Sequence, residues 1–164
     1  MAFQSQVSRL LDEEHRALLD LLGQAEQALG RLARTNGPGD ASLAPLLKRL
    51  DQQMAHDIGR HFDFEEQSLF PRLVDAGDGD MAGLLSEEHS VIREVAAELL
   101  PLARAAQAGT LDAAGWRALT QGTLELIERQ VSHIQKETMA LLPLLDELLD
   151  DESDGQLALA YADA

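Results

Sequence analysis

The residues of this chain that could do chemistry occur in two similar sets. The motif L-L-x-E-E-H ends at His15 and occurs again 74 residues later, where it ends at His89. The motif H-x3-E-x3-L-x-P-x-L starts at His61 and again at His133, with Glu65 and Glu137 at equivalent positions. Because the polar residues repeat as clearly as the leucines, the sequence predicts two related helical hairpins arranged about a pseudo-twofold axis.

These side chains interrupt apolar helix faces. His133 and Glu137 share one face of the last predicted helix, because residues four apart lie one turn apart, and His61 and Glu65 do the same on the second. A buried carboxylate or imidazole without a partner is costly, and no Lys or Arg lies on these faces. A metal would satisfy all of them. Imidazole and carboxylate without thiolate suit iron or manganese in octahedral sites, and each carboxylate could bridge two ions. The alternative is a set of core histidines hydrogen-bonded to the two glutamates.

Composition excludes several classes of protein. The chain has 164 residues, 45% apolar and 26% charged, which is typical of one globular domain. Acids outnumber bases 29 to 13, and the net charge of −16 argues against binding to nucleic acid or an anionic membrane surface. The absence of cysteine excludes disulfides and thiolate metal sites. No signal peptide or bilayer-spanning apolar run is visible, so we expect a cytoplasmic protein.

The elements that must position these residues are long helices. Good helix formers and apolar positions spaced by three and four predict an all-α, up-down-up-down four-helix bundle within residues 1–150. Clusters of Gly and Pro at residues 35–40, 75–80 and 108–110 separate the helices, which are expected at 4–34, 42–74, 80–107 and 111–150. Residues 151–164 form an acidic tail, either a weak terminal helix or a mobile segment, and the six acids of 146–154 are interpreted as a solvated end.

The order of these residues on four helices resembles the hemerythrin-like, His-His-Glu cation-binding family over about residues 5–150. The resemblance implies a hemerythrin-like bundle with a non-haem di-iron centre that has an oxo or hydroxo bridge, iron being favoured over manganese or zinc. It implies that one iron is held by His15 and His61 and the other by His89 and His133. It implies that Glu65 and Glu137 bridge the two irons.

One position departs from the oxygen-carrying hemerythrins, which have a further histidine where this chain has Arg93. The site therefore resembles six-ligand members, some of them associated with nitrosative or oxidative stress, in which both irons keep open positions. That favours an oxidoreductase-type reaction with O₂, NO or peroxide, supported by an electron donor, over simple oxygen carriage. A non-catalytic O₂ or iron sensor, carrier or iron-binding module is the alternative, and a metal-free interaction bundle is a third.

Three acidic residues near the histidines have open roles. Glu14 and Glu88 precede the single histidines and either hydrogen-bond to an imidazole on a neighbouring helix or lie on solvated faces. Asp57, one turn before His61, is either an extra ligand, a partner of a ligand, or a rim residue paired with Arg60.

The remaining conspicuous side chains have simpler interpretations. His56 is expected on the surface, about 140° from His61 around the helix. Arg93 either guards the open metal positions or pairs with a nearby acid. Four aromatic residues are expected in the core, where they could also keep the site dry: Phe62, Phe64, Phe70 and Trp116.

Overall fold

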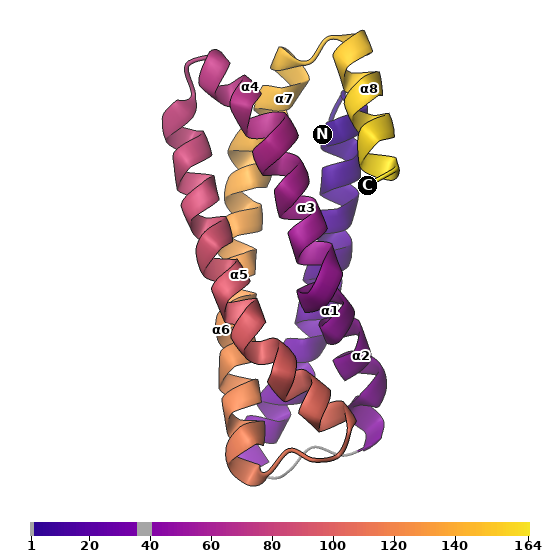
Figure 1. Cartoon of the computed structure of the whole chain (residues 1–164), viewed down its shortest axis with the longest axis vertical. Coiled ribbons are helices and arrows are strands. Elements are labelled where there is room, and N and C mark those ends of the chain that lie inside the picture. Colours follow the sequence, from indigo (N-terminus) through magenta and orange to yellow (C-terminus); the bar gives the residue numbers. More distant parts are fainter. Residues whose placement is uncertain (1, 36–40) are drawn as a thin grey trace.

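A computed structural model describes residues 2–35 and 41–164. Of the Gly- and Pro-containing break predicted at 35–40, only Thr35 is among the described residues. Four helical rods run side by side along the long axis (Figure 1). The first rod is α1 (Gln6–Thr35) and the third is α5 (Gly79–Gln107). The described residues contain helices and turns but no strand, which confirms the predicted all-α four-helix bundle.

The second and fourth rods are segmented, whereas the sequence predicted unbroken helices over 42–74 and 111–150. Wide π-helical turns interrupt both rods. The second rod consists of η1 (Ala41–Leu43), α2 (Ala44–Gln52), η2 (Gln53–Asp57), α3 (Ile58–Phe64), η3 (Glu65–Leu69) and α4 (Phe70–Asp75). The fourth consists of α6 (Ala113–Lys136), η4 (Glu137–Leu141) and α7 (Leu142–Leu148).

A repeated proline explains two of these π turns. Pro71 and Pro143 are the second residues of α4 and α7, directly after η3 and η4. A proline in a helix lacks the N–H that would bond to the carbonyl four residues earlier, and its ring presses on that carbonyl. A wider preceding turn relieves both problems. η3 begins at Glu65 and η4 at Glu137, so both predicted carboxylate ligands lie at the first residue of a π turn.

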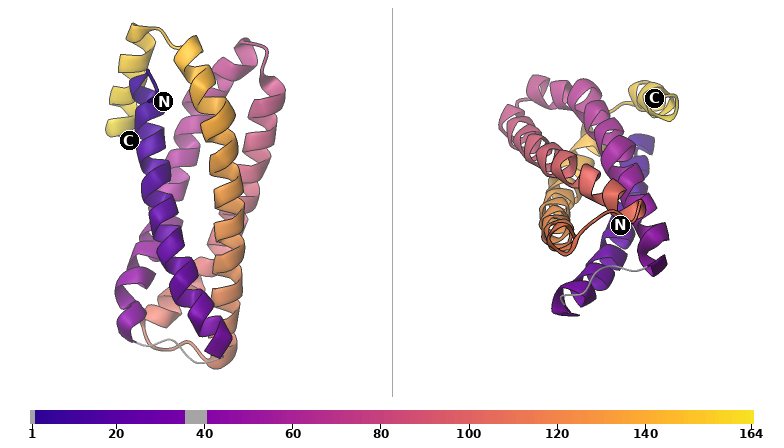
Figure 2. Two further views of the ribbon diagram at one scale, coloured as in Figure 1. Left: turned by 180° about the vertical axis from the view of Figure 1, so that it is seen from behind. Right: turned by 60° about the horizontal axis from the view of Figure 1, so that its bottom comes forward.

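The acidic tail forms a helix, α8 (Asp151–Ala162), which packs along α1 near the N-terminus (Figures 1 and 2). Asp154 accepts hydrogen bonds from the backbone N–H groups of Gln6 (2.8 Å) and Val7 (3.0 Å) at the start of α1. Asp146 of α7 accepts two more from the residues just before them. Carboxylates at a helix N-terminus satisfy its free N–H groups and its positive dipole end. The interpretation of these acids as a solvated end is therefore wrong for Asp146 and Asp154, while the division of the chain at residue 150 stays a prediction.

Separate apolar clusters lie toward the two ends of the bundle, with a layer of polar side chains near its middle. At the end that carries α8, leucines such as Leu11 and Leu85 pack with Tyr161. Toward the other end, Ile92 and Leu119 belong to a separate apolar cluster. On the first and third rods, His15 lies one turn after Leu11 and His89 one turn after Leu85. On the second rod, Phe62 and Phe64, one from each cluster, lie between His61 and Glu65. No helix in the described parts of the chain is long and apolar enough to cross a membrane.

Candidate metal centre

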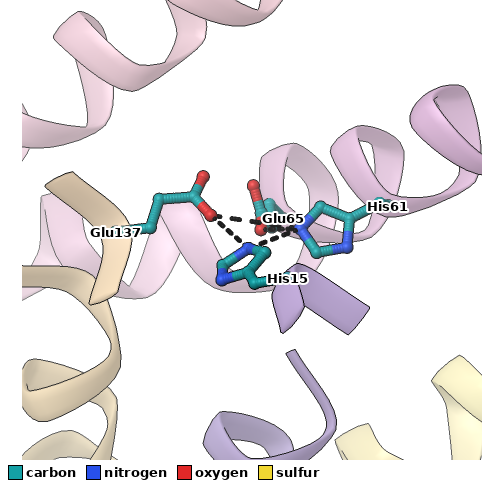
Figure 3. Close-up of side chains that lie close together, drawn as sticks. All are labelled: His15, His61, Glu65 and Glu137. Atoms are coloured by element: carbon teal, nitrogen blue, oxygen red, sulfur yellow. Dashed lines mark hydrogen bonds and ion pairs between the residues drawn. The ribbon is translucent and has the colours of Figure 1, made fainter. Parts of the chain in front are cut away.

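All six predicted ligands meet in the polar layer of the bundle. They form two groups that share both glutamates, and the potential ligand atoms within each group lie within 4.8 Å of one another. The first group is His15, His61, Glu65 and Glu137, and the second is Glu65, His89, His133 and Glu137. Figure 3 shows the first group, in which side chains from different rods point toward one another. All are buried except His61, whose side chain is 12% exposed.

Each glutamate turns one oxygen toward each pair of histidines. Oε1 of Glu65 lies 2.6 Å from His61 Nε2, and Oε2 lies 3.1 Å from His89 Nε2. Oε2 of Glu137 lies 2.9 Å from His15 Nε2, and Oε1 lies 2.6 Å from His133 Nε2. Both carboxylates thus span the two groups, as bridging ligands would.

The donor atoms of both groups fit a cation. None of the four carboxylate oxygens receives a well-directed hydrogen bond from the described residues, although imidazole nitrogens lie as close as 2.6 Å. The two Nε2 atoms are 3.2 Å apart in the pair of His15 and His61, and 3.0 Å apart in the pair of His89 and His133. Two nitrogens bound at right angles, each about 2.1 Å from one ion, would lie about 3.0 Å apart. Buried anionic oxygens and paired nitrogens therefore converge as ligand atoms around a shared ion converge.

Three outer carboxylates fix the orientation of the imidazoles. The Nδ1–H of His61 donates to Glu14 on α1 (2.8 Å), and that of His133 donates to Glu88 on α5 (2.7 Å). For Glu14 and Glu88 the structure thus selects the hydrogen bond to a neighbouring helix over a solvated face. A carboxylate that accepts from Nδ1 leaves the Nε2 lone pair free for a metal and makes it more basic.

The third outer carboxylate, Glu66, is one that sequence reasoning missed. Its Oε1 accepts from His89 Nδ1 at 2.8 Å. The second half of the chain has Thr138 at the equivalent position, so the repeat gave no signal for Glu66. His15 is the exception among the four histidines, since its buried Nδ1 has no hydrogen-bond partner within residues 2–35 and 41–164.

Arg93 pairs with acids, which is one of the two roles predicted for it. Its guanidinium donates to Asp63 (2.9 Å) and more weakly to Glu66 (3.4 Å), and it lies over the ring of Phe62. Phe62 in turn stacks on the imidazole of His89, with centroids 3.7 Å apart. The four aromatic residues are buried and His56 is exposed, as predicted: Phe62, Phe64, Phe70 and Trp116 lie in the core.

A pocket of about 230 Å³ opens beside the group of His15 and His61, and Asp57 is among the residues that line it. Gln130, which sequence reasoning also missed, is buried and lines the same pocket. The amide nitrogen of Gln130 has no hydrogen-bond partner among the described residues, so it is a free donor. The signal was available, because Gln130 interrupts the apolar seam of its helix one turn before His133.

Comparison with protein families identifies the bundle. The model of the hemerythrin HHE cation binding domain matches residues 6–145, most of the chain. The chain belongs to the hemerythrin HHE family. Among curated proteins, no sequence matches it significantly. Membership of this cation-binding family agrees with the structure, in which the two His/Glu groups could hold a metal.

The HHE match ends before α8, yet α8 contacts a carboxylate that supports the centre. The hydroxyl of Tyr161 donates to the Glu14 carboxylate that also accepts from His61. Arg60 lies over the Tyr161 ring and contacts Glu14 as well, rather than pairing with Asp57 as one alternative predicted. Burial raises the pKa of Glu14, but the hydrogen bonds from His61 and Tyr161, together with the charges of His61 and Arg60, outweigh burial, so the net pKa is lowered. Glu14 is therefore held ionised as an acceptor for His61.

Replacing Tyr161 with phenylalanine keeps the ring, which packs 4.4 Å from that of Phe64, and removes only the hydroxyl. We expect the free energy of unfolding to fall by about 1 kcal/mol, because one acceptor site of Glu14 loses its donor. Urea unfolding measures this value. A Tyr161→Phe variant as stable as the wild type would show that Glu14 does not depend on α8.

Without a cation, charge in the centre must be balanced by protons. Burial lowers the pKa of His89, but the contacts with Glu137 and Glu65 raise it overall to about 9. Burial also lowers the pKa of His133 and of His61, but the carboxylates around each imidazole outweigh it. The pKa of His133 is therefore raised, and that of His61 is raised well above its usual range. Burial raises the pKa of Glu137, but the imidazoles around it, with His133 first, lower it well below its usual range.

These shifts predict the pH dependence of the metal-free HHE protein. The pKa of His89 is about 9 in the folded chain and near 6.5 when unfolded, so its stabilising charge is fully present below pH 6.5. That contribution is lost as the pH rises toward 9, and the melting temperature of the metal-free protein should fall over this window. Metal binding needs neutral imidazoles, so metal affinity should rise over the same window. A metal-free protein that gains stability between pH 6.5 and 9 would contradict this assignment.

Proposed function

We propose that this HHE protein binds two iron ions and carries out a redox reaction on a small ligand, namely O₂, NO or peroxide. His15 and His61 would hold one ion, His89 and His133 the other, and Glu65 and Glu137 would bridge them. The observation that carries this proposal is the orientation of the two buried glutamates, each of which presents one oxygen to each histidine pair. Iron, when bound, supplies ferrous–ferric redox chemistry and open coordination positions. Manganese has similar ligand preferences and is the competing metal.

The number of protein ligands leaves room for a small molecule. Each group offers two imidazole nitrogens and two carboxylate oxygens, which are four of the six positions of an octahedral ion. The pocket lined by Asp57 and Gln130 reaches the group of His15 and His61 and gives a ligand its route.

The chain's own residues have distinct roles in this proposal. Glu14, Glu66 and Glu88 hold the imidazoles in place through Nδ1. The free amide N–H of Gln130 would donate a hydrogen bond to the ligand. Phe62, which is stacked on His89, would keep water from that side of the centre. We place the protein in the cytoplasm, where an electron donor would return the centre to its reduced state.

Turnover distinguishes the two remaining functions. The diferrous protein, made anaerobically, is mixed with peroxide or with NO in a stopped-flow instrument in the presence of a chemical reductant. Consumption of many equivalents per chain supports a redox enzyme. Binding of one equivalent, with no further consumption, would contradict the enzyme assignment and favour a sensor or carrier.

A Gln130→Leu variant tests the role of the pocket amide. Leucine fills a similar volume without a donor, so we expect azide to bind up to about tenfold more weakly to the iron-loaded protein, the effect of one hydrogen bond. Optical titration with azide measures the affinity, and the iron content should not change. Unchanged azide affinity would exclude Gln130 from the ligand site.

A further inference from the structure

We propose that the two halves of the metal centre are unequal, and that the half built on His89 and His133 binds its ion first and more tightly. This inference rests on the proposed function, which assigns two ions to the centre. It concerns what the proposal leaves open, namely whether the two ions are equivalent.

The inequality does not come from the ligand atoms. Each half offers two Nε2 atoms and one oxygen from each glutamate. The Nε2 separations are also similar, 3.2 Å for His15 and His61 and 3.0 Å for His89 and His133. A difference in affinity must therefore arise from the groups behind the imidazoles.

Those groups differ. Both histidines of the tighter half donate Nδ1–H to a carboxylate, His89 to Glu66 and His133 to Glu88. In the other half only His61 does so, while Nδ1 of His15 is buried without a partner in the described chain. A carboxylate behind an imidazole fixes its orientation and tautomer and makes it a stronger ligand.

The cause is one departure from the internal repeat. Glu65 and Glu66 correspond to Glu137 and Thr138. Nε2 of His15 lies 2.9 Å from Oε2 of Glu137, just as Nε2 of His89 lies 3.1 Å from Oε2 of Glu65. Thr138 therefore occupies, in the second half of the repeat, the position that Glu66 has in the first. Threonine is too short and carries no charge, and this leaves His15 without the support that His89 has.

Exposure acts in the same direction. The side chains of His89 and His133 are 0% and 2% exposed, whereas that of His61 is 12% exposed. The pocket is lined by both histidines of the His15 and His61 half, but only by His133 of the other half. Water competes more easily for the ion at the His15 and His61 half. A chain with less than two equivalents of metal should therefore hold its single ion between His89 and His133.

Titration of the metal-free chain with Co(II), under argon and against a competing chelator, measures the two affinities through visible absorption. We expect two steps whose dissociation constants differ by about tenfold or more, the size of effect that an outer carboxylate has on metal affinity. Glu66→Thr should weaken the first step, and Thr138→Glu should strengthen the second. The double variant should exchange the roles of the two halves. Glu13→Thr, at an exposed glutamate of α1, is the control for loss of one charge.

The outcomes separate this inference from the proposal beneath it. Two equal steps, or two unequal steps that neither Glu66→Thr nor Thr138→Glu shifts, overturn the inequality and leave the two-ion centre standing. Absence of any bound ion rejects the two-ion centre, and the inequality with it. Glu66→Gln, which keeps the shape of the side chain and loses its charge, replaces Glu66→Thr if circular dichroism shows that the latter does not fold.

Discussion

Replacing Glu137 with alanine should remove both of the proposed metal ions from the protein. The two oxygens of Glu137 lie 2.9 Å from His15 Nε2 and 2.6 Å from His133 Nε2, so the variant takes one ligand from each half. Loss of an outer-shell partner weakens metal binding by about 10–100-fold, and loss of a direct bridging ligand should exceed the upper end of that range. Elemental analysis of protein purified without chelators should fall from near two ions per chain to almost none.

Two further variants make this result specific. Glu65→Ala should behave in the same way, because Glu65 also faces both halves. Glu147→Ala, at an exposed glutamate of α7, should keep its full metal content. If Glu137→Ala folds, as judged by circular dichroism, and still holds two ions, the bridging role of Glu137 is wrong.

Metal binding should also dominate the stability of the bundle. An ion present at about a thousand times its dissociation constant stabilises the folded state by about 4 kcal/mol, so two such ions contribute roughly 8 kcal/mol. For a chain of this length each kcal/mol raises the melting temperature by about 2–4 °C, which gives a rise of roughly 15–30 °C. Calorimetry of the metal-loaded and chelator-treated protein measures the difference.

The variants again supply the control for stability. Glu137→Ala should melt at the same temperature with and without added metal, because it has no site left to be stabilised. Equal melting temperatures for the loaded and the chelated wild type would mean that the centre does not bind a cation in the folded chain.

The fold and the six central residues could be predicted because each carries a signal in its own rod. Apolar spacing predicts four helices, and His133 and Glu137 interrupt such a face at a position where a polar side chain must be buried. The repeat of both motifs then places Glu65 and Glu137 at related positions. Glu14 and Glu88 could be considered as partners because they recur beside the single histidines.

The remaining features depend on contacts that a linear pattern does not contain. Glu66 has no counterpart in the repeat, and only the packing of η3 against α5 brings it to His89. Tyr161 reaches Glu14 across 147 positions of the chain, from a short helix in which Asp154 also caps α1. The π turns at η3 and η4 precede Pro71 and Pro143, which lie inside the helices predicted over 42–74 and 111–150, so the apolar spacing alone did not reveal these breaks.

Anomalous X-ray diffraction at the iron edge, from crystals of protein purified with its metal, tests the two-ion centre most directly. Two peaks are expected inside the bundle, one between His15 and His61 and one between His89 and His133, with Glu65 and Glu137 reaching both. A map with no peak among these six side chains, or with one peak bound to a single histidine pair and neither glutamate bridging, would contradict it.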